Sequence, residues 1–161
     1  MPKEKVPQKN SAVYSFKVYL GQKRLKRPRA PWRLIEIRGD QTLADLHKAI
    51  FTAFDRYDEH LYSFYLGDQE FAPVPPEELL PAALVRRLFS GGKAAGVKSR
   101  IKDLGLTAGD WFTYLFDFGD EWWHVVELVK IEERLGSAAD YPRVVEKRGE
   151  SPPQYPDWEE E

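Results

Sequence analysis

The sequence contains no cysteine, and this absence limits the chemistry that is open to the chain. Disulfide bonds and cysteine-ligated zinc both require thiols, so both are excluded. No run of 18 or more apolar residues occurs, which excludes a membrane-spanning helix. The first residues, Met1 to Lys5, are followed by no apolar stretch, so we expect no secretory signal and a cytoplasmic location.

The chain also lacks a strong net charge, since its formal charge is −2, but its charges are unevenly distributed. Residues 1–33 contain ten Lys or Arg and one acid, residues 34–145 contain twelve basic and nineteen acidic residues, and residues 146–161 contain two and six. A basic arm of this kind can bind nucleic acid. A solvated terminus and a charged loop give the same pattern, so both interpretations stay open.

What the sequence does contain is a large share of β-formers, with 14% aromatic residues. Short segments that alternate apolar and polar residues between Gly, Pro and Asp predict strands. The predicted strands cover residues 13–20, 32–38, 61–66, 111–118 and 122–131.

One strong helix signal begins at Thr42, which is followed three residues later by Asp45 in an acidic version of the capping box. His47 lies on or beside the apolar stripe of this helix, and we expect a partly buried core histidine that is bonded to a backbone group. The stripe steps by three and four residues and consists of Leu43, Leu46, Ile50 and Phe54.

This order of elements predicts an α+β fold with a β-grasp-like mixed sheet. The sheet would contain two β-hairpins and a central strand, with one main amphipathic helix packed on a face and a short helical insertion near residues 81–90. We expect a disordered arm over residues 1–11, a single domain over residues 12–145, and an extended, acidic, Pro-rich tail over residues 146–161.

The least generic stretch is the acidic hairpin at residues 116–124. Gly-Asp at residues 119–120 suits a two-residue hairpin loop, because glycine supplies a positive φ. With that loop, Leu115 pairs with His124, and Asp117 becomes a diagonal neighbour of His124 on one face. Their Cβ atoms would then lie roughly 7–8 Å apart.

Three interpretations of this hairpin stay open. Asp117 and His124 can be structural, with the carboxylate accepting backbone N–H groups and the imidazole satisfying a buried acceptor. Alternatively Asp117, Asp120 and His124, together with His60, can bind a divalent metal ion through oxygen and imidazole ligands. The third interpretation is a binding surface formed by aromatic residues from both strands, namely Tyr114, Phe116, Trp122 and Trp123.

The ordered series of these motifs resembles the Ri-plasmid ORF-three-like family over about residues 12–155. Some members of that family are labelled insertion-element passenger proteins of TnpR type, but this sequence has no evident recombinase serine site. Members usually end in Pro-Pro-Glu-Asp after a Tyr-Pro, and here Gln154 stands where the first acid is expected. The motifs that carry the resemblance lie at residues 14–18, 31–35, 42–47, 60–64 and 112–120, followed by Trp122 and His124.

The leading hypothesis is a non-enzymatic binding or adaptor domain, associated with mobile elements, for a protein or nucleic-acid partner. A nucleic-acid partner would be held by the N-terminal arm and the basic segment 23–33, in which Arg24, Arg27 and Arg33 are the candidate contacts. We predict no cofactor and no membrane partner for this domain.

The alternative is a metal-dependent hydrolase or nuclease. It would use Asp117, Asp120 and His124, with His60 as a further candidate, and it would require a divalent metal as cofactor. The side chains of these residues must then converge in one cleft.

Overall fold

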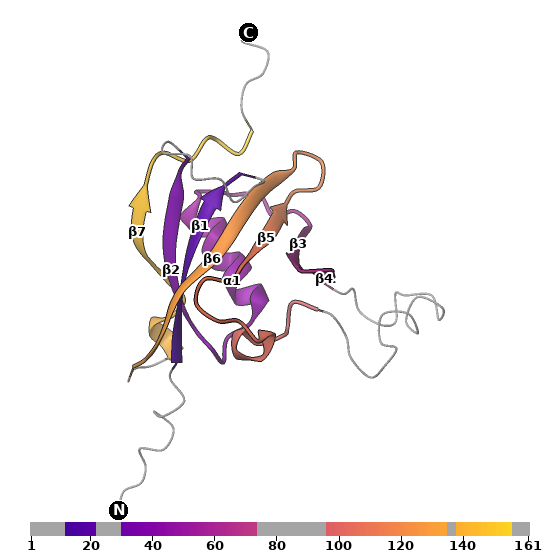
Figure 1. The fold of residues 1–161 in the computed structure, drawn as a ribbon. Helices are drawn as coiled ribbons and strands as arrows, with labels where there is room; N and C mark the ends of the chain where they lie inside the picture. Colours follow the sequence, from indigo (N-terminus) through magenta and orange to yellow (C-terminus); the bar gives the residue numbers. More distant parts are fainter. Residues whose placement is uncertain (1–11, 22–29, 74–95, 135–137, 156–161) are drawn as a thin grey trace, which may run out of the picture.

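The computed structural model describes residues 12–21, 30–73, 96–134 and 138–155, and these residues form a seven-stranded sheet with one α-helix on one of its faces (Figure 1). The strands run in the order β4-β3-β5-β6-β1-β2-β7 across the sheet. In chain order the elements are β1 (Ala12–Leu20), β2 (Trp32–Arg38), α1 (Leu43–Ala53), β3 (Tyr62–Leu66), β4 (Gln69–Phe71), η4 (Ile101–Leu104), β5 (Trp111–Phe116), β6 (Trp122–Glu133), η5 (Ala138–Asp140) and β7 (Arg143–Arg148).

The α+β class is confirmed, but the sheet is not the mixed sheet that we predicted, because every named strand pair is antiparallel. The predicted hairpins β1–β2 and β5–β6 are both present. The difference arises from β6, which is twelve residues long and runs back along the whole of β1. β1 therefore lies between two antiparallel neighbours, and a β-grasp arrangement is not seen.

The ends of the chain that we predicted from composition can be compared only in part. β7 runs through residues 143–148 and crosses the predicted domain boundary at 145–146, because it pairs with β2. The predicted arm at 1–11 and the predicted helix near 81–90 lie outside the described residues. Within the residues that the structure does describe, no helix has the length and apolar character needed to cross a membrane.

The start of α1 confirms the predicted capping box. The Thr42 hydroxyl accepts a hydrogen bond from the Asp45 backbone N–H at 3.2 Å, and the Asp45 carboxylate accepts one from the Thr42 N–H at 3.0 Å. These two bonds satisfy N–H groups that a helix start otherwise leaves without partners. The predicted apolar stripe of the helix is fully buried against the sheet: Leu43, Leu46, Ile50 and Phe54.

The core lies between α1 and one face of the sheet, and the opposite face of the sheet carries no helix among the described residues. Strand alternation sends every second side chain toward the helix. The strands contribute to this core Tyr14, Phe16, Val18, Ile35, Ile37, Tyr62, Phe64, Phe71, Phe112, Tyr114, Phe116, Val126 and Leu128.

Three connecting segments meet at the end of the sheet where the β5–β6 hairpin turns (Figure 1). The loop 54–61 follows α1, the loop 117–121 joins β5 to β6, and residues 149–155 follow β7. Asp117 N–H donates to the Leu61 carbonyl at 2.9 Å, and the Ser151 hydroxyl donates to the Phe54 carbonyl at 2.9 Å. We call residues 149–155 the strap, because they cross the loop 54–61.

Candidate functional site

The β5–β6 hairpin has a longer loop than the sequence predicted. Phe116 pairs with Trp122, so the loop is the five residues 117–121, and His124 pairs with Tyr114. The predicted pairing of Leu115 with His124 was therefore wrong by one residue. A slip of one residue moves a side chain to the opposite face of a sheet, and His124 consequently points into the core.

Asp117 is the reason for this longer loop. It adopts a left-handed backbone conformation with φ 67°, and its carboxylate accepts hydrogen bonds from the N–H groups of Gly119 at 3.1 Å and Asp120 at 3.2 Å. Its carbonyl also accepts a hydrogen bond from the Glu121 N–H at 2.6 Å. The structural interpretation of Asp117 is confirmed, because a short carboxylate that bonds to nearby backbone is a typical turn-forming group.

Of the residues that we predicted as a metal cluster, only Asp117 and His60 lie close together. Asp117 is occupied by the turn and lies 3.5 Å from His60 Nε2, Asp120 is exposed, and His124 is buried on the helix side of the sheet. Within the described part of the chain, no group of three or more His, Asp or Glu side chains is placed to hold a metal ion.

His60 belongs to a small polar network that holds the strap. Its Nε2 atom lies 2.8 Å from the Tyr155 hydroxyl, which also donates to the Asp58 carboxylate at 3.0 Å. Loss of solvent around the phenol, together with this carboxylate, raises the pKa of Tyr155 to about 12. Tyr155 therefore stays protonated at neutral pH and serves as a hydrogen-bond donor.

His47 is a core histidine, as predicted, but its partners are side chains and not a backbone group. Its Nδ1 atom lies 2.6 Å from the Tyr114 hydroxyl, its Nε2 atom lies 3.0 Å from Glu59, and its ring stacks on Tyr62 with 3.7 Å between centroids. Burial lowers the pKa of His47 despite the opposing effect of Glu59. Tyr114 is only 1% exposed, so it belongs to the core and not to a binding surface.

Arg33, a predicted nucleic-acid contact, is buried and bonds to carbonyl groups inside the protein. Its Nε atom donates to the Ala53 carbonyl at 2.8 Å, and its Nη1 atom donates to Trp32 at 2.9 Å and to Gly149 at 3.0 Å. It therefore joins the end of α1 to the strap and presents no charge to a partner. The other two predicted contacts, Arg24 and Arg27, lie outside the described residues.

Arg56 is a buried arginine that no sequence motif marked as a candidate. It is 7% exposed, and it donates to the Phe54 carbonyl at 3.3 Å and to His124 Nε2 at 3.2 Å. Its guanidinium lies over the Trp122 ring, 4.7 Å from the centroid. No described carboxylate forms an ion pair with it, and burial lowers the pKa of Arg56 to about 10.

His124 shares this environment and bonds directly to Arg56. Burial, followed by the nearby positive charge of Arg56, lowers the pKa of His124 to about 3. The ring is therefore neutral at pH 7, and its Nε2 atom accepts the hydrogen bond from the guanidinium. The three buried side-chain polar atoms without a hydrogen-bond partner in the described structure all lie in this cluster: Arg56 Nε, Trp122 Nε1 and His124 Nδ1.

Trp122 and Trp123 point to opposite faces of the sheet, as adjacent strand residues must. Trp122 lies beside Arg56 on the helix side. Trp123 lies on the face opposite α1, which no described helix covers and which we call the uncovered face. Its ring centroid is 5.7 Å from that of Tyr65. The two tryptophans therefore belong to two different environments.

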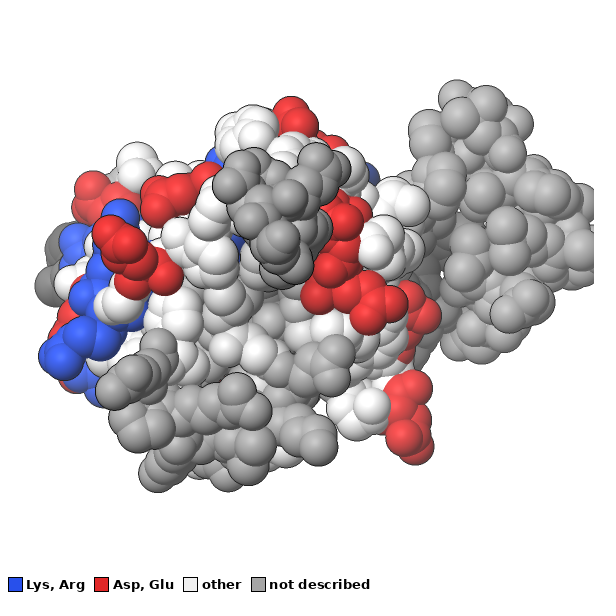
Figure 2. Space-filling view, turned by 90° about the horizontal axis from the view of Figure 1, so that it is seen from above, with Lys and Arg blue, Asp and Glu red and all other residues white. Residues whose placement is uncertain are grey.

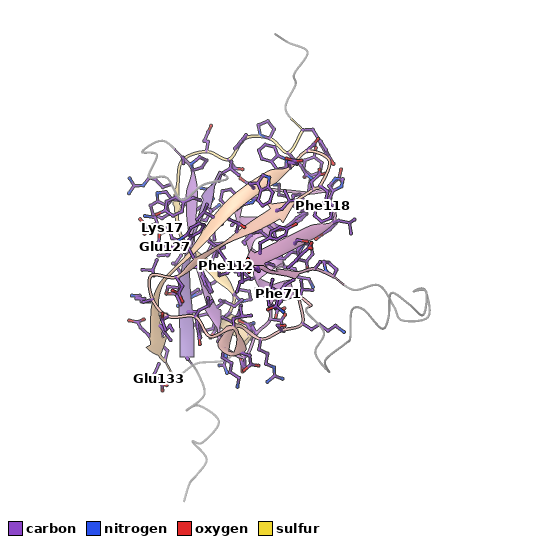
Figure 3. All side chains as sticks on the ribbon, turned by 45° about the vertical axis from the view of Figure 1, so that its right-hand side comes forward. Lys17, Phe71, Phe112, Phe118, Glu127 and Glu133 are labelled. Atoms are coloured by element: carbon purple, nitrogen blue, oxygen red, sulfur yellow. The ribbon has the colours of Figure 1, made fainter. Side chains whose placement is uncertain are left out.

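The strand register places one row of side chains straight across the uncovered face. Lys17 lies beside this row, with its Nζ atom 4.1 Å from the Trp32 ring centroid and 5.2 Å from that of Tyr19. Lys17 is opposite Glu127 in the β1–β6 pair, and Figure 3 labels both side by side. We call the following residues, in order from β3 to β7, the aromatic row: Tyr65, Thr113, Val125, Tyr19, Trp32 and Arg148.

Basic side chains gather on one side of the hairpin end of the molecule, where acidic side chains lie among them. Figure 2 looks onto this end and shows Lys and Arg side chains gathered at the left margin, the side on which β7 lies in Figure 1, with a group of acidic side chains to the right of centre. The exposed cations at the end of β7 that pairs with Trp32 are Lys147 and Arg148. The aromatic row therefore ends at the basic margin.

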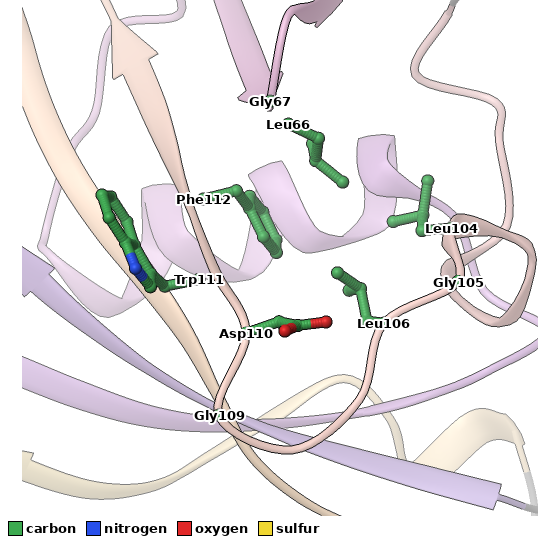
Figure 4. A pocket seen from close by; sticks show the side chains of 9 residues that line it. All are labelled: Leu66, Gly67, Leu104, Gly105, Leu106, Gly109, Asp110, Trp111 and Phe112. Atoms are coloured by element: carbon green, nitrogen blue, oxygen red, sulfur yellow. The ribbon is translucent and has the colours of Figure 1, made fainter.

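A pocket of about 440 Å³ opens at the start of β5, away from the hairpin end. Leu66, Leu104, Leu106 and Phe112 point into it, whereas the Trp111 ring points away (Figure 4). One carboxylate oxygen of Asp110 at its rim already accepts hydrogen bonds from the backbone and hydroxyl groups of Thr107. No residue that we predicted for function lines this pocket.

Comparisons with known proteins agree with this fold and leave its chemistry open. The model of a family described as "Plasmid pRiA4b ORF-3-like protein" matches residues 12–155. The uncharacterised protein y4hQ of Sinorhizobium fredii is 30% identical over 112 residues, which is 70% of this chain and 52% of that protein, so the chain spans about half the length of this curated relative. The crystal structure of a protein of unknown function, MM3350 from Methanosarcina mazei Go1, has a TM-score of 0.66 and 24% identity, covering 91% of this chain and 75% of that one.

Proposed function

The chain belongs to the plasmid pRiA4b ORF-3-like family, and from this premise we propose that it is a non-enzymatic binding module for single-stranded nucleic acid. The proposed contact surface is the uncovered face of the sheet. The plasmid in the family's name supports the further proposal that the module is associated with mobile elements. A nucleic-acid partner suits that setting.

The observation that carries this proposal is the aromatic row. Tyr65, Tyr19 and Trp32 lie on three different strands of one face, and each ring is partly exposed. Trp123 adds a further ring beside Tyr65. Rings spread across a sheet face suit the stacking of successive unpaired bases, because every base offers a flat π-face.

Positive charges lie where the backbone of such a ligand would run. Lys17 and Arg148 both lie over the Trp32 ring, at 4.1 Å and 5.8 Å from its centroid. The segment 22–29, between β1 and β2 in the sequence, contains a further five Lys or Arg. Phosphate contacts from such cations would make the affinity fall steeply with salt.

The test is fluorescence anisotropy of a labelled oligo-deoxythymidine, titrated with the full chain at low and at physiological salt. We expect saturable binding that weakens as salt rises. Trp32→Leu removes a ring but keeps an apolar side chain, and it should weaken binding by about 1–3 kcal/mol, the value typical of one stacked base.

Tyr57→Leu is the matched control, because Tyr57 is 67% exposed but lies on the loop 54–61 and not on the sheet face. It should bind the oligonucleotide as the wild type does. Absence of binding to single-stranded DNA and RNA at low salt would disprove the proposal, and so would equal losses in the two variants.

A protein partner for the same face is the second candidate function, and it is favoured by Trp111. This apolar ring lies opposite Glu127 in the β5–β6 pair and is 45% exposed. A protein partner predicts binding that responds to Trp32→Leu but persists at high salt.

A further inference from the structure

Three buried N–H groups at the hairpin end have no acceptor in the described structure, and two of them lie against each other. These two are Arg56 Nε and Trp122 Nε1. The third is His124 Nδ1, which carries the imidazole proton because Nε2 accepts the hydrogen bond from Arg56. The guanidinium of Arg56 lies 4.7 Å from the centroid of the Trp122 ring, so the donors belong to one stacked pair. Buried N–H groups without acceptors are rare in proteins, and each one requires an explanation.

Arg56 also has no ion-pair partner among the described residues, although the Asp55 carboxylate acts on its charge from a distance. Arg56 contacts a carbonyl group and a neutral imidazole, and no described carboxylate pairs with it. Phe54 and Phe116 offer ring faces to the guanidinium at 5.7 Å, but aromatic rings supply no formal negative charge. A buried cation is normally paired with an anion.

We propose that Arg56 and Trp122 form a binding site for an oxyanion, a phosphate or carboxylate group, which accepts hydrogen bonds from Arg56 Nε and Trp122 Nε1. An oxyanion suits both features of the pair, because it supplies several acceptor oxygens and a negative charge. The indole can only donate a hydrogen bond, so a cationic or purely donating ligand would leave it unsatisfied.

The strap is the lid of this site. Ser151 and Arg56 donate to the same Phe54 carbonyl, so the strap lies directly beside the guanidinium. Gln154 is 2% exposed and accepts hydrogen bonds from the N–H groups of Tyr57 at 2.8 Å and Asp58 at 3.1 Å, the two residues after Arg56. It also donates to the Asp58 carbonyl at 2.9 Å. These three bonds hold the lid shut, and an anion enters when they break.

The test is a titration of the full chain with inorganic phosphate, and separately with acetate, at constant ionic strength in chloride. The readout is the set of indole N–H signals in a ¹H–¹⁵N NMR spectrum, with the Trp122 signal assigned through Trp122→Phe. We expect a saturable shift of the Trp122 signal. Comparison of the two titrations shows whether the site binds phosphate, acetate or both.

Matched variants separate this site from a non-specific salt effect. Arg56→Met should abolish the shift. Gln154→Ala should bind the anion on the order of tenfold more tightly, because opening the lid then breaks fewer hydrogen bonds. Trp123→Phe makes a comparable tryptophan change on the opposite face and should leave the Trp122 shift unchanged.

A trapped water molecule would also satisfy the two donors, but it would give no dependence on anions. If neither phosphate nor acetate moves the Trp122 signal in the wild type and in Gln154→Ala, the proposal is wrong. This outcome is independent of oligonucleotide binding at the aromatic row, which Trp32→Leu tests on the other face of the sheet.

Discussion

Two buried arginines lie against the same phenylalanine, but they differ in how many hydrogen-bond acceptors the protein offers them. The Arg33 guanidinium lies 4.8 Å from the Phe54 ring centroid and the Arg56 guanidinium lies 5.7 Å from it. Arg33 donates to four described carbonyl groups, from Trp32, Ala53, Arg148 and Gly149. Arg56 donates to one carbonyl and one imidazole and keeps an unpartnered Nε.

The two arginines differ in how fully the protein itself replaces the hydrogen bonds that a buried cation loses from water. Burying a cation is costly unless hydrogen bonds replace those lost from water. At Arg33 carbonyl oxygens from the end of α1 and the end of β7 supply them, so the residue joins two elements that are far apart in the sequence. At Arg56 the replacement is incomplete, which is typical of a position adapted to something other than stability.

Arg33→Met should produce the largest effect on stability. It removes four hydrogen bonds and leaves the carbonyl groups of Ala53 and Gly149 without that donor, so we expect a loss of about 3 kcal/mol in the free energy of unfolding. Urea unfolding followed by tryptophan fluorescence measures it. Lys147→Met, at the position paired with Arg33 on β7, is the control and should change stability by less than about 0.5 kcal/mol. A loss no larger than that of the control would contradict the role of Arg33 in joining the end of α1 to the end of β7.

The sequence predicted the elements around Arg33 well because they depend on local signals. The alternation of residues 32–38 matches β2 residue for residue, and the Thr42–Asp45 pair correctly marks the start of α1. The burial of Arg33 could not be predicted from local signals. Its partners Ala53 and Gly149 are 20 and 116 residues away, and no local pattern reveals such contacts.

The residues around Arg56 were harder to predict for the same reason. Arg56 meets His124 across 68 residues, and Gln154 meets the loop 54–61 across 96 and 97 residues. The predicted hairpin register was wrong by one residue because Asp117 and Glu121 both adopt a positive φ, which is uncommon for residues with a side chain. Its carboxylate role in the turn was nevertheless predictable, because Asp commonly bonds to nearby backbone.

Acid should disturb the Arg56 side of Phe54 through His124. The folded pKa of His124 is about 3, below the ordinary value of 6.5, so the folded state excludes a proton that the unfolded chain binds. The stability that depends on neutral His124 is complete above pH 6.5 and is lost as the pH falls toward 3. The expected slope from this residue is about 1.4 kcal/mol per pH unit.

Urea unfolding of the wild type and of His124→Gln at pH 6.5, 5.5 and 4.5 measures this slope. The variant replaces the imidazole with a side chain that does not titrate. Its free energy of unfolding should therefore fall less steeply with pH, by about 1.4 kcal/mol per pH unit. This difference in slope does not depend on the stability of the variant at pH 7. Burial lowers the pKa of His47 as well, and that contribution should persist in the variant. Equal slopes in the two proteins would show that His124 is not the group that acid disturbs.

Arg56→Met should have the smallest effect on stability, and it tests directly whether the two buried arginines differ. Methionine fills much of the same volume among Phe54, Phe116 and Trp122, and it removes a buried cation that has no described anionic partner. Replacing an incompletely satisfied buried charge with an apolar side chain is often neutral or stabilising, so we expect a change within about 1 kcal/mol in either direction. The same urea experiment as for Arg33→Met measures it. A loss as large as that of Arg33→Met would mean that the fold already satisfies Arg56 as fully as Arg33, and that no ligand is needed to explain its burial.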